Sequence, residues 1–242
     1  MRLLLTLQYL GTRYAGWQTQ TNATGVQQVV EGALGTMFGT LVRTEGASRT
    51  DSGVHAAAQR AHADVPFEIA PRGVIRGLND LLPYDIRAVD AAYVGDDFHC
   101  RHRARRKTYV YRIWNEEVAD VFAAETHTHV AQRLDVGSMH EAAQPLVGEH
   151  DFRAYTVAAP EVSTTVRTVE AIAVERREPL VTITITANGF LRYMVRRIAG
   201  SLIEVGRGKL DRAASGQSLE PQFAEARWTA PAKGLTLIDI QY

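Results

Sequence analysis

The stretch RLLLTLQY, residues 2–9, has leucine from Leu3 to Leu7 except at Thr6, and its polar residues Arg2, Thr6 and Gln8 fall on alternate positions. This alternation predicts a β-strand with one buried face, because successive side chains of a strand point to opposite faces. The apolar run is too short for the hydrophobic region of a secretory signal. We therefore expect the chain to open with a strand of a folded domain.

The elements predicted after this strand follow the order βαββαβ. Apolar residues at helical spacing predict a helix over 26–38, and Pro71 marks the start of a second helix that reaches residue 82. This order predicts an antiparallel sheet whose helices cover one face, as in ferredoxin-like domains. The other strands are expected at 42–46, 56–65 and 86–94.

The second half of the chain also mixes helices and strands. Strands are predicted at 107–114, 166–176, 180–187 and 235–240, and helices at 136–146 and 190–205. We expect an α+β fold of two ferredoxin-like, βαββαβ-type subdomains, residues 1–105 and 106–242. Their antiparallel sheets are expected to join into one extended central sheet, with the helices on one face and a cleft between the subdomains. No Pro-rich or Ser-rich linker marks the boundary.

Cysteine content and hydropathy point to a cytoplasmic protein. Cys100 is the single cysteine, which excludes an intramolecular disulfide and a cysteine-rich zinc site. No window offers the roughly 18 apolar residues that a membrane helix needs. We expect no membrane association and no bound metal.

The net charge of zero hides an uneven distribution of arginine. The 27 basic residues comprise 24 Arg and 3 Lys, and five of the seven residues from Arg101 to Lys107 are basic. A second group lies between Arg192 and Lys209. Local positive fields attract polyanions even when the total charge is zero, and the arginine fork suits phosphate. Such runs can also be ordinary solvated faces.

The sequence ASRTDSGVHA, residues 47–56, lies between two predicted strands and concentrates polar groups in one loop. Asp51 can be an aspartate that hydrogen-bonds its own turn. It can also be a catalytic carboxylate, with Arg49 close enough to keep it charged or to hold a phosphate. The residues alone leave both interpretations open.

The stretch RTDSGVHA, residues 49–56, resembles the RTDAGVHA signature of the TruA family of tRNA pseudouridine synthases. Further family motifs occur in the same order along nearly the whole chain: YLGTRYAGWQ (9–18), NDLLPYD (79–85), DDFHCR (96–101), KTYVYRI (107–113), GEHDF (148–152) and NGFLRYMVRRIAGSL (188–202). Ser48 and Ser52 depart from the usual Gly and Ala, which should change loop packing without removing a reacting group.

The resemblance implies that the chain isomerises uridine to pseudouridine at positions 38, 39 and 40 of the tRNA anticodon stem-loop. It implies no cofactor, a homodimer as the active form, and Asp51 as the catalytic residue with Arg49 and Arg196 in support. Neighbouring positions of a helix point about 100° apart, so only one of Arg196 and Arg197 can face the catalytic loop. Tyr109 would stack on the target base, although its place in a strand also fits core packing. The residues expected to bind phosphates are Arg101, Arg105, Arg106 and Lys107.

Two other functions compete with this one. A structured-RNA-binding module would use the same arginines and Tyr109, but it has no use for a carboxylate such as Asp51 among phosphates. A metal-dependent hydrolase could be built on the histidine pairs His99/His102 and His127/His129, but neither pair has further ligands at metal-site spacing. We expect these histidines, with His55 and His62, to be surface or stacking residues.

Overall fold

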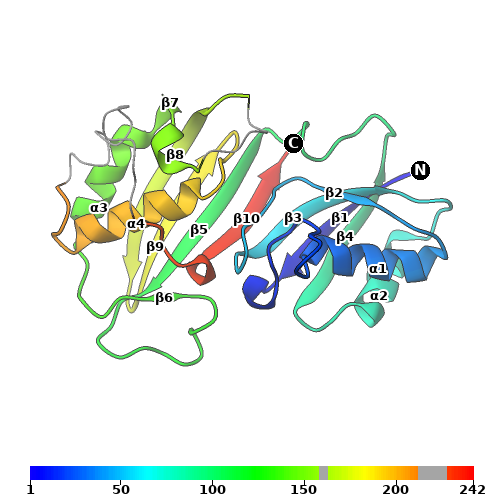
Figure 1. The fold of residues 1–242 in the computed structure, drawn as a ribbon, viewed down its shortest axis with the longest axis horizontal. Helices are drawn as coiled ribbons and strands as arrows, with labels where there is room; N and C mark the ends of the chain where they lie inside the picture. The colour runs from blue at the N-terminus through cyan, green and yellow to red at the C-terminus, as the bar shows by residue number, and fades with distance from the viewer. Residues whose placement is uncertain (158–162, 212–227) are drawn as a thin grey trace. The chain divides into compact units, whose positions relative to one another are not determined.

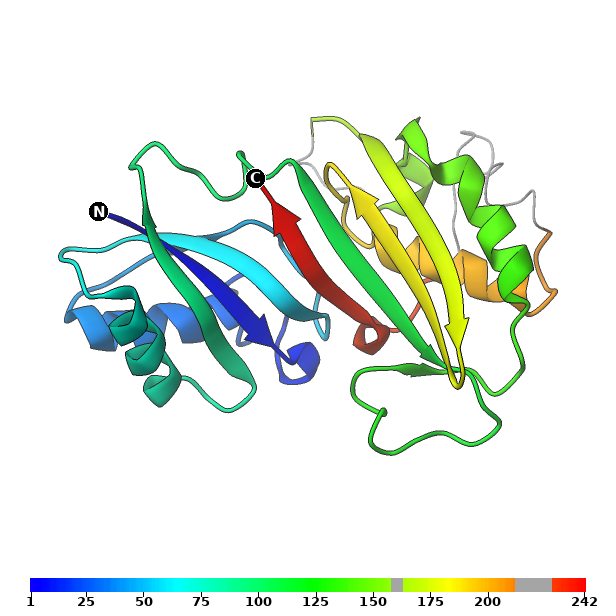
Figure 2. The same cartoon turned by 180° about the vertical axis from the view of Figure 1, so that it is seen from behind.

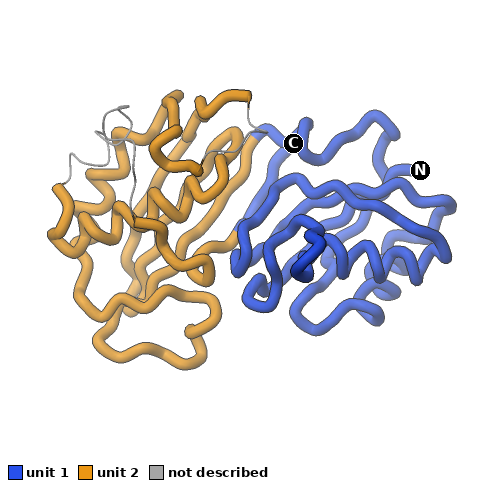
Figure 3. Tube along the Cα trace, in the orientation of Figure 1, with its two compact units in different colours: residues 1–105, 237–242 blue, residues 106–236 orange. Residues whose placement is uncertain are grey.

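The computed structural model describes residues 1–157, 163–211 and 228–242, and the chain divides into two compact units (Figures 1 and 3). The first unit comprises Met1–Arg105 together with Leu237–Tyr242, and the second comprises Arg106–Thr236. Over the described residues, no helix is both long and apolar enough to cross a membrane. The α+β class predicted from the sequence is confirmed, because each unit contains helices and a mostly antiparallel set of strands.

The first unit has the predicted βαββαβ order, and the last strand of the chain joins it. Its strands lie in the order β4-β1-β3-β10, with the short β2 paired to β3. Both neighbours of β1 are antiparallel to it. The elements are β1 (Arg2–Tyr9), η1 (Gly11–Arg13), α1 (Val26–Phe38), β2 (Thr44–Gly46), β3 (His55–Asp64), α2 (Pro71–Leu81), β4 (Ile86–Val94) and β10 (Leu235–Gln241).

The core of the first unit follows from the alternation in β1. Leu3, Leu5 and Leu7 are fully buried, as the pattern RLLLTLQY predicts. The helices α1 and α2 supply apolar partners such as Leu34 and Leu78, which are also fully buried. Figure 1 shows both helices in front of the strands of this unit, and Figure 2 shows the strands from behind.

The second unit is built on the strand order β5-β9-β8-β7, with β6 paired in parallel to β5. In β9 every second residue is buried, so the unit has one apolar sheet face against which its helices pack. The elements are β5 (Arg106–Trp114), β6 (Thr128–His129), α3 (Val136–Ala143), η2 (Gln144–Leu146), β7 (Gly148–Asp151), η3 (Arg153–Tyr155), β8 (Val166–Arg177), β9 (Leu180–Ala187), α4 (Met194–Gly206) and η5 (Ala232–Gly234).

The structure differs from the predicted elements at the start of one helix and at two short strands. The helix expected from residue 190 begins only at Met194, because Tyr193 adopts a left-handed conformation with φ of 64°. The strands β6 and β7 are absent from the prediction, since two and four residues are too few for an alternation to be recognised. The other helices and strands lie within a few residues of their predicted ranges.

Candidate active site

The loop that carries Asp51 connects β2 to β3 in the first unit, and the segment after β1 anchors its backbone. The Trp17 N–H donates to the Thr50 carbonyl (3.1 Å), and the Gly53 N–H donates to the Tyr14 carbonyl (3.2 Å). These two bonds lie on either side of Asp51 in the sequence. The loop therefore has a fixed position on the unit.

Two glycines allow the close approach between these segments. A Cβ atom on Gly16 would lie 2.5 Å from the Thr50 carbonyl oxygen, and Gly16 has a φ of 89° that L-residues rarely adopt. A Cβ atom on Gly11 would lie 2.0 Å from the Val54 carbonyl oxygen. Only glycine fits at either position without displacing the loop backbone.

A buried carboxylate, that of Asp85, also holds this anchoring segment. The Tyr14 hydroxyl donates to Asp85 Oδ1 (2.7 Å), and Arg13 Nη1 lies 3.3 Å from Asp85 Oδ2. Burial and the hydrogen bond to Asp85 raise the pKa of Tyr14, so the phenol stays a donor. Three motifs that are far apart in sequence, 9–18, 49–56 and 79–85, therefore meet in one unit.

Asp51 is half-buried at the turn of the loop, whereas Arg49 is exposed. The Asp51 carbonyl accepts a hydrogen bond from the Val54 N–H (3.1 Å), and Gly53 supplies the left-handed conformation of the turn with φ of 78°. A half-buried position lets a carboxylate reach solvent on one side while the loop backbone fixes it on the other. That is the environment expected of a reactive aspartate.

The two serines that depart from the usual signature are built into the loop packing. The Ser52 hydroxyl donates to the Tyr14 carbonyl (3.3 Å). The backbone of Ser48 makes two bonds to the buried Gln59 amide: Ser48 N to Oε1 (3.2 Å) and Nε2 to Ser48 O (2.6 Å). The loop packing of this chain therefore involves both substituted positions.

Two residues outside the loop hold it in ways that sequence reasoning missed. The Thr50 hydroxyl lies 2.9 Å from that of Tyr9, which is 41 residues earlier in the chain. Gln59, which bonds the Ser48 backbone, is 11 residues later. No local pattern could have indicated either role, because each depends on a contact between separate elements.

Tyr109 lies in the second unit, on β5 opposite Ile185 of β9. Its side chain is only 5% exposed, and its ring meets the Phe190 ring edge-on with centroids 5.0 Å apart. Tyr109 therefore has the core-like packing that its strand position suggested. A firmly packed ring is also what a stacking platform for a base requires, so burial does not separate the two roles.

The two neighbouring arginines of α4 make different contacts. Arg196 Nε donates to the Ala230 carbonyl (2.9 Å), and the Ala230 N–H donates back to the Arg196 carbonyl (3.0 Å). Arg197 Nη1 donates to the carbonyls of Ala154 (3.2 Å) and Thr156 (2.7 Å). Helical geometry thus directs the two guanidinium groups to different neighbours, as their spacing predicts.

Tyr193 immediately precedes α4 and is the one non-glycine residue with positive φ in the part of the chain that the structure describes. The left-handed conformation costs a residue with a Cβ atom about 1–2 kcal/mol. Tyr193 makes no side-chain cap bond to the helix. The guanidinium carbons of Arg192 and Arg196 lie 5.2 and 5.0 Å from the centroid of its ring.

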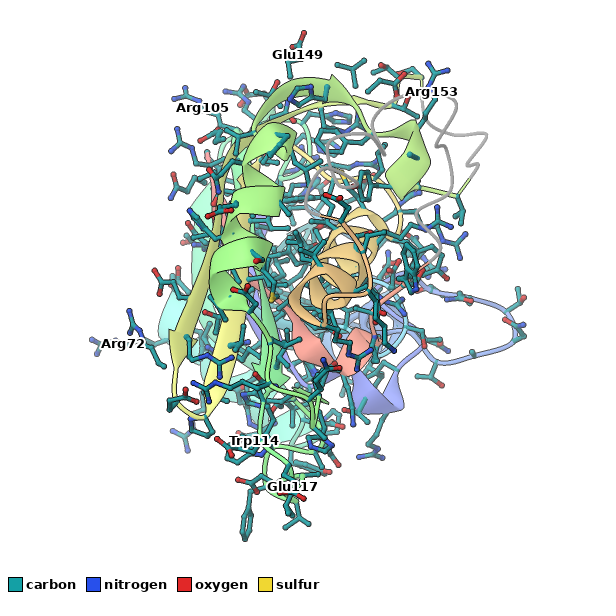
Figure 4. The ribbon with its side chains drawn as sticks, turned by 90° about the vertical axis from the view of Figure 1, so that its left-hand side faces the viewer. Arg72, Arg105, Trp114, Glu117, Glu149 and Arg153 are labelled. Atoms are coloured by element: carbon teal, nitrogen blue, oxygen red, sulfur yellow. The ribbon has the colours of Figure 1, made fainter. Side chains whose placement is uncertain are left out.

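The basic run at the sequence boundary of the two units is mostly at the surface. Arg101, Arg105 and Arg106 are exposed, and Lys107 is half-buried. Arg106 Nε lies 3.4 Å from Glu170 Oε2 in the second unit. Figure 4 shows Arg105 pointing outward into solvent.

The histidines near the end of the first unit stack on one another. The His99 and His102 ring centroids are 4.1 Å apart, and the His62 ring meets the His99 ring edge-on at 4.8 Å. These three are stacking residues, as expected. His55 differs from that expectation: it is buried, and its Nδ1 accepts a hydrogen bond from the Gly11 N–H (2.9 Å), which ties the loop to η1.

Within residues 1–157, 163–211 and 228–242, no group of three or more His, Cys, Asp or Glu side chains could hold a metal ion.

Comparison with known proteins gives consistent results. A family model described as tRNA pseudouridine synthase matches residues 6–103 and 142–242. The chain is similar to tRNA pseudouridine synthase A of Myxococcus xanthus, at 40% identity over 100% of this chain and 92% of the relative. It is also similar to tRNA pseudouridine synthase A 2 of Bacillus anthracis, at 40% identity over 98% of both chains.

Among solved structures, the crystal structure of a Cbf5-Nop10-Gar1 complex contains a chain that aligns with 97% of this one, over 48% of its own length. The TM-score is 0.37 and the identity is 13%. That likeness is too distant to support any inference about function.

Proposed function

The chain belongs to the tRNA pseudouridine synthase family, and we propose that it isomerises uridine to pseudouridine in tRNA. The reaction breaks the bond between C1′ of the ribose and N1 of uracil and forms a bond between C1′ and C5. The C5 proton is lost and N1 gains a proton, so the reaction is balanced without an oxidant, a reductant or an energy source.

We propose Asp51 as the catalytic carboxylate. The observation that supports this role best is the construction of its loop. The motif of residues 9–18, whose Tyr14 is in turn bonded to Asp85, holds the backbone on both sides of one half-buried aspartate. Gly11 and Gly16 bring the backbone of this motif so close to the loop that no other residue fits, and this approach fixes the position of the loop that carries Asp51.

Arg49 and Arg196 are proposed to support Asp51 by favouring its ionised form, which the carboxylate needs in order to act either as a nucleophile or as a base. Both arginines donate to backbone carbonyls of their own unit, Arg196 to that of Ala230 and Arg197 to those of Ala154 and Thr156. The choice of Arg196 over Arg197 therefore follows from the family resemblance. Tyr109 is proposed to stack on the uracil after it leaves the helical stem, a step that costs a few kcal/mol.

The proposed RNA is the anticodon stem-loop, as the family resemblance implies. The exposed residues Arg101, Arg105 and Arg106, with Lys107, are proposed to contact its phosphates and so to offset the cost of extruding the base. A single cysteine and a tRNA substrate are both in keeping with the cytoplasm as the proposed compartment.

The experiment that tests the catalytic proposal compares Asp51→Asn with wild type. Release of tritium from tRNA labelled at uridine C5 measures turnover, and filter binding measures affinity. We expect turnover to be lost while affinity stays within a few fold, because Asn keeps the shape of the side chain but cannot act as nucleophile or base. Substantial isomerisation by the variant would exclude Asp51 as the catalytic residue.

We also propose that two copies of the chain associate through the loop that follows β5. Val118, Val121 and Phe122 in this loop are 76%, 79% and 95% exposed. Trp114 Nε1 donates to the Val118 carbonyl (3.0 Å), which ties the start of this loop to the end of β5. Ordered apolar side chains that face water are typical of a protein interface.

The charge of this loop argues against RNA as its partner. Between Asn115 and Gln132 the sequence has four acidic residues and no Arg or Lys. The test is the molar mass in solution by light scattering. Phe122→Asp should yield monomers, whereas Leu41→Asp, which changes a 71% exposed residue of the first unit, should not. A Phe122→Asp protein with the mass of wild type would contradict this interface.

A further inference from the structure

Tyr193 combines two features that disfavour stability at one position. Its backbone has φ of 64°, in a region that tyrosine rarely adopts. It also occupies the N-cap of α4, where Ser, Thr, Asp or Asn would accept a hydrogen bond from the first turn, and it makes no such bond. Asparagine would cost less at this position, because Asn tolerates the left-handed conformation.

What the tyrosine provides instead is a ring against two guanidinium groups. Arg192 precedes Tyr193 by one residue and Arg196 follows it by three, and their guanidinium carbons lie 5.2 and 5.0 Å from the ring centroid. The left-handed turn lets the Tyr193 ring contact both Arg192, which precedes the helix, and Arg196, which lies in its first turn. Cations within about 6 Å of an aromatic centroid are attracted by its quadrupole.

The contacts of Arg196 come from different directions. Its Nε donates to the Ala230 carbonyl (2.9 Å), while its guanidinium carbon lies over the Tyr193 ring. A hydrogen bond from Nε by itself would let the plane of the guanidinium rotate about that bond. A ring over the group restricts this rotation, so the contact with Tyr193 limits the orientations open to the Arg196 guanidinium.

We propose that Tyr193 is a positioning residue that sets the orientation of the Arg196 guanidinium. This inference rests on the proposed function, in which Arg196 supports the catalytic carboxylate. Tyr193 acts through Arg196 and needs no contact with the substrate. The ring is the required part, and the hydroxyl is dispensable.

The test compares Tyr193→Asn with Tyr193→Phe. Asparagine tolerates the left-handed backbone conformation but has no ring, whereas phenylalanine keeps the ring and loses only the hydroxyl. For Tyr193→Asn we expect an unchanged or higher melting temperature, a kcat lowered about 10- to 100-fold and a KM for tRNA within about 3-fold of wild type. Tyr193→Phe should keep a kcat within about 3-fold of wild type.

Nuclear magnetic resonance gives a readout that does not depend on activity. The Arg196 Nε–H signal should show the ring-current shift of a nearby aromatic group in wild type and in Tyr193→Phe, and should lose it in Tyr193→Asn. An inactive wild type that shows this pattern would refute the proposed function and leave the positioning by Tyr193 intact. A Tyr193→Asn protein with the kcat of wild type, or a Tyr193→Phe protein as slow as Tyr193→Asn, would overturn the proposal.

Discussion

Gly16→Ala should displace the loop that carries Asp51. The added Cβ atom would lie 2.5 Å from the Thr50 carbonyl oxygen, roughly 0.9 Å short of the 3.4 Å at which ordinary contact begins. The obstacle is backbone, so no side chain can rotate out of the way. Thr50 is the residue before Asp51, and a displacement near 1 Å at a reacting group can cost about 100-fold in rate.

The cost in stability has two parts that a control variant separates. Gly16 has a φ of 89°, and the left-handed conformation costs alanine about 1–2 kcal/mol. The steric clash should add about 1–3 kcal/mol, as overpacking does elsewhere. Gly39, at the end of α1, has a φ of 68° and no atom within 4 Å of its added Cβ. Gly39→Ala therefore has the backbone cost without the clash.

Urea denaturation would measure the free energy of unfolding, and tritium release would measure turnover. We expect Gly39→Ala to lose about 1–2 kcal/mol and to keep the kcat of wild type. Gly16→Ala should lose about 2–5 kcal/mol and about 10- to 100-fold in kcat. If Gly16→Ala lost no more stability than Gly39→Ala, or kept the kcat of wild type, the close approach would not determine where Asp51 lies.

Three further predictions concern RNA binding, the target base and pH. Arg105→Gln should make the slope of log affinity against log salt shallower by about 0.7–0.9, the contribution of one phosphate, and an unchanged slope in filter binding would remove Arg105 from the interface. Tyr109→Phe should bind tRNA normally but turn over more slowly, because it lacks the hydroxyl that can relay a proton, and Tyr109→Leu should be slower still because it also lacks the ring. Equal rates for wild type and Tyr109→Phe would limit Tyr109 to stacking. Burial lowers the pKa of His62, and the nearby Arg2 and His99 lower it further. The unfolded chain therefore binds a proton at this histidine more readily than the folded chain does. The free energy of unfolding should fall as the pH falls below about 6.5. His62→Asn should flatten this dependence between about pH 7 and 5 in urea denaturation, and a dependence as steep as that of wild type would refute the assignment.

The local pattern of apolar residues is enough to predict most of the secondary structure. The range of α1 is predicted to the residue because its apolar side chains repeat at helical spacing over 13 residues. β9 is predicted just as closely because its apolar and threonine residues alternate without a break. Both patterns reflect which face of an element is buried, which is a property of neighbouring residues in the chain. The ordered motifs likewise point to the family from sequence alone.

Contacts between distant parts of the chain could be identified only from the tertiary structure. The alternation in residues 235–240 predicts a strand, but only strand pairing places Leu237–Tyr242 in the first unit. The motif of residues 79–85 indicates a relationship to the family but not that Asp85 accepts a hydrogen bond from Tyr14, 71 residues away. Tyr193 reads as part of a helix until its backbone conformation is known. Sequence periodicity records burial along one element, whereas these features depend on which elements meet, and that is decided only when the chain packs into its final fold.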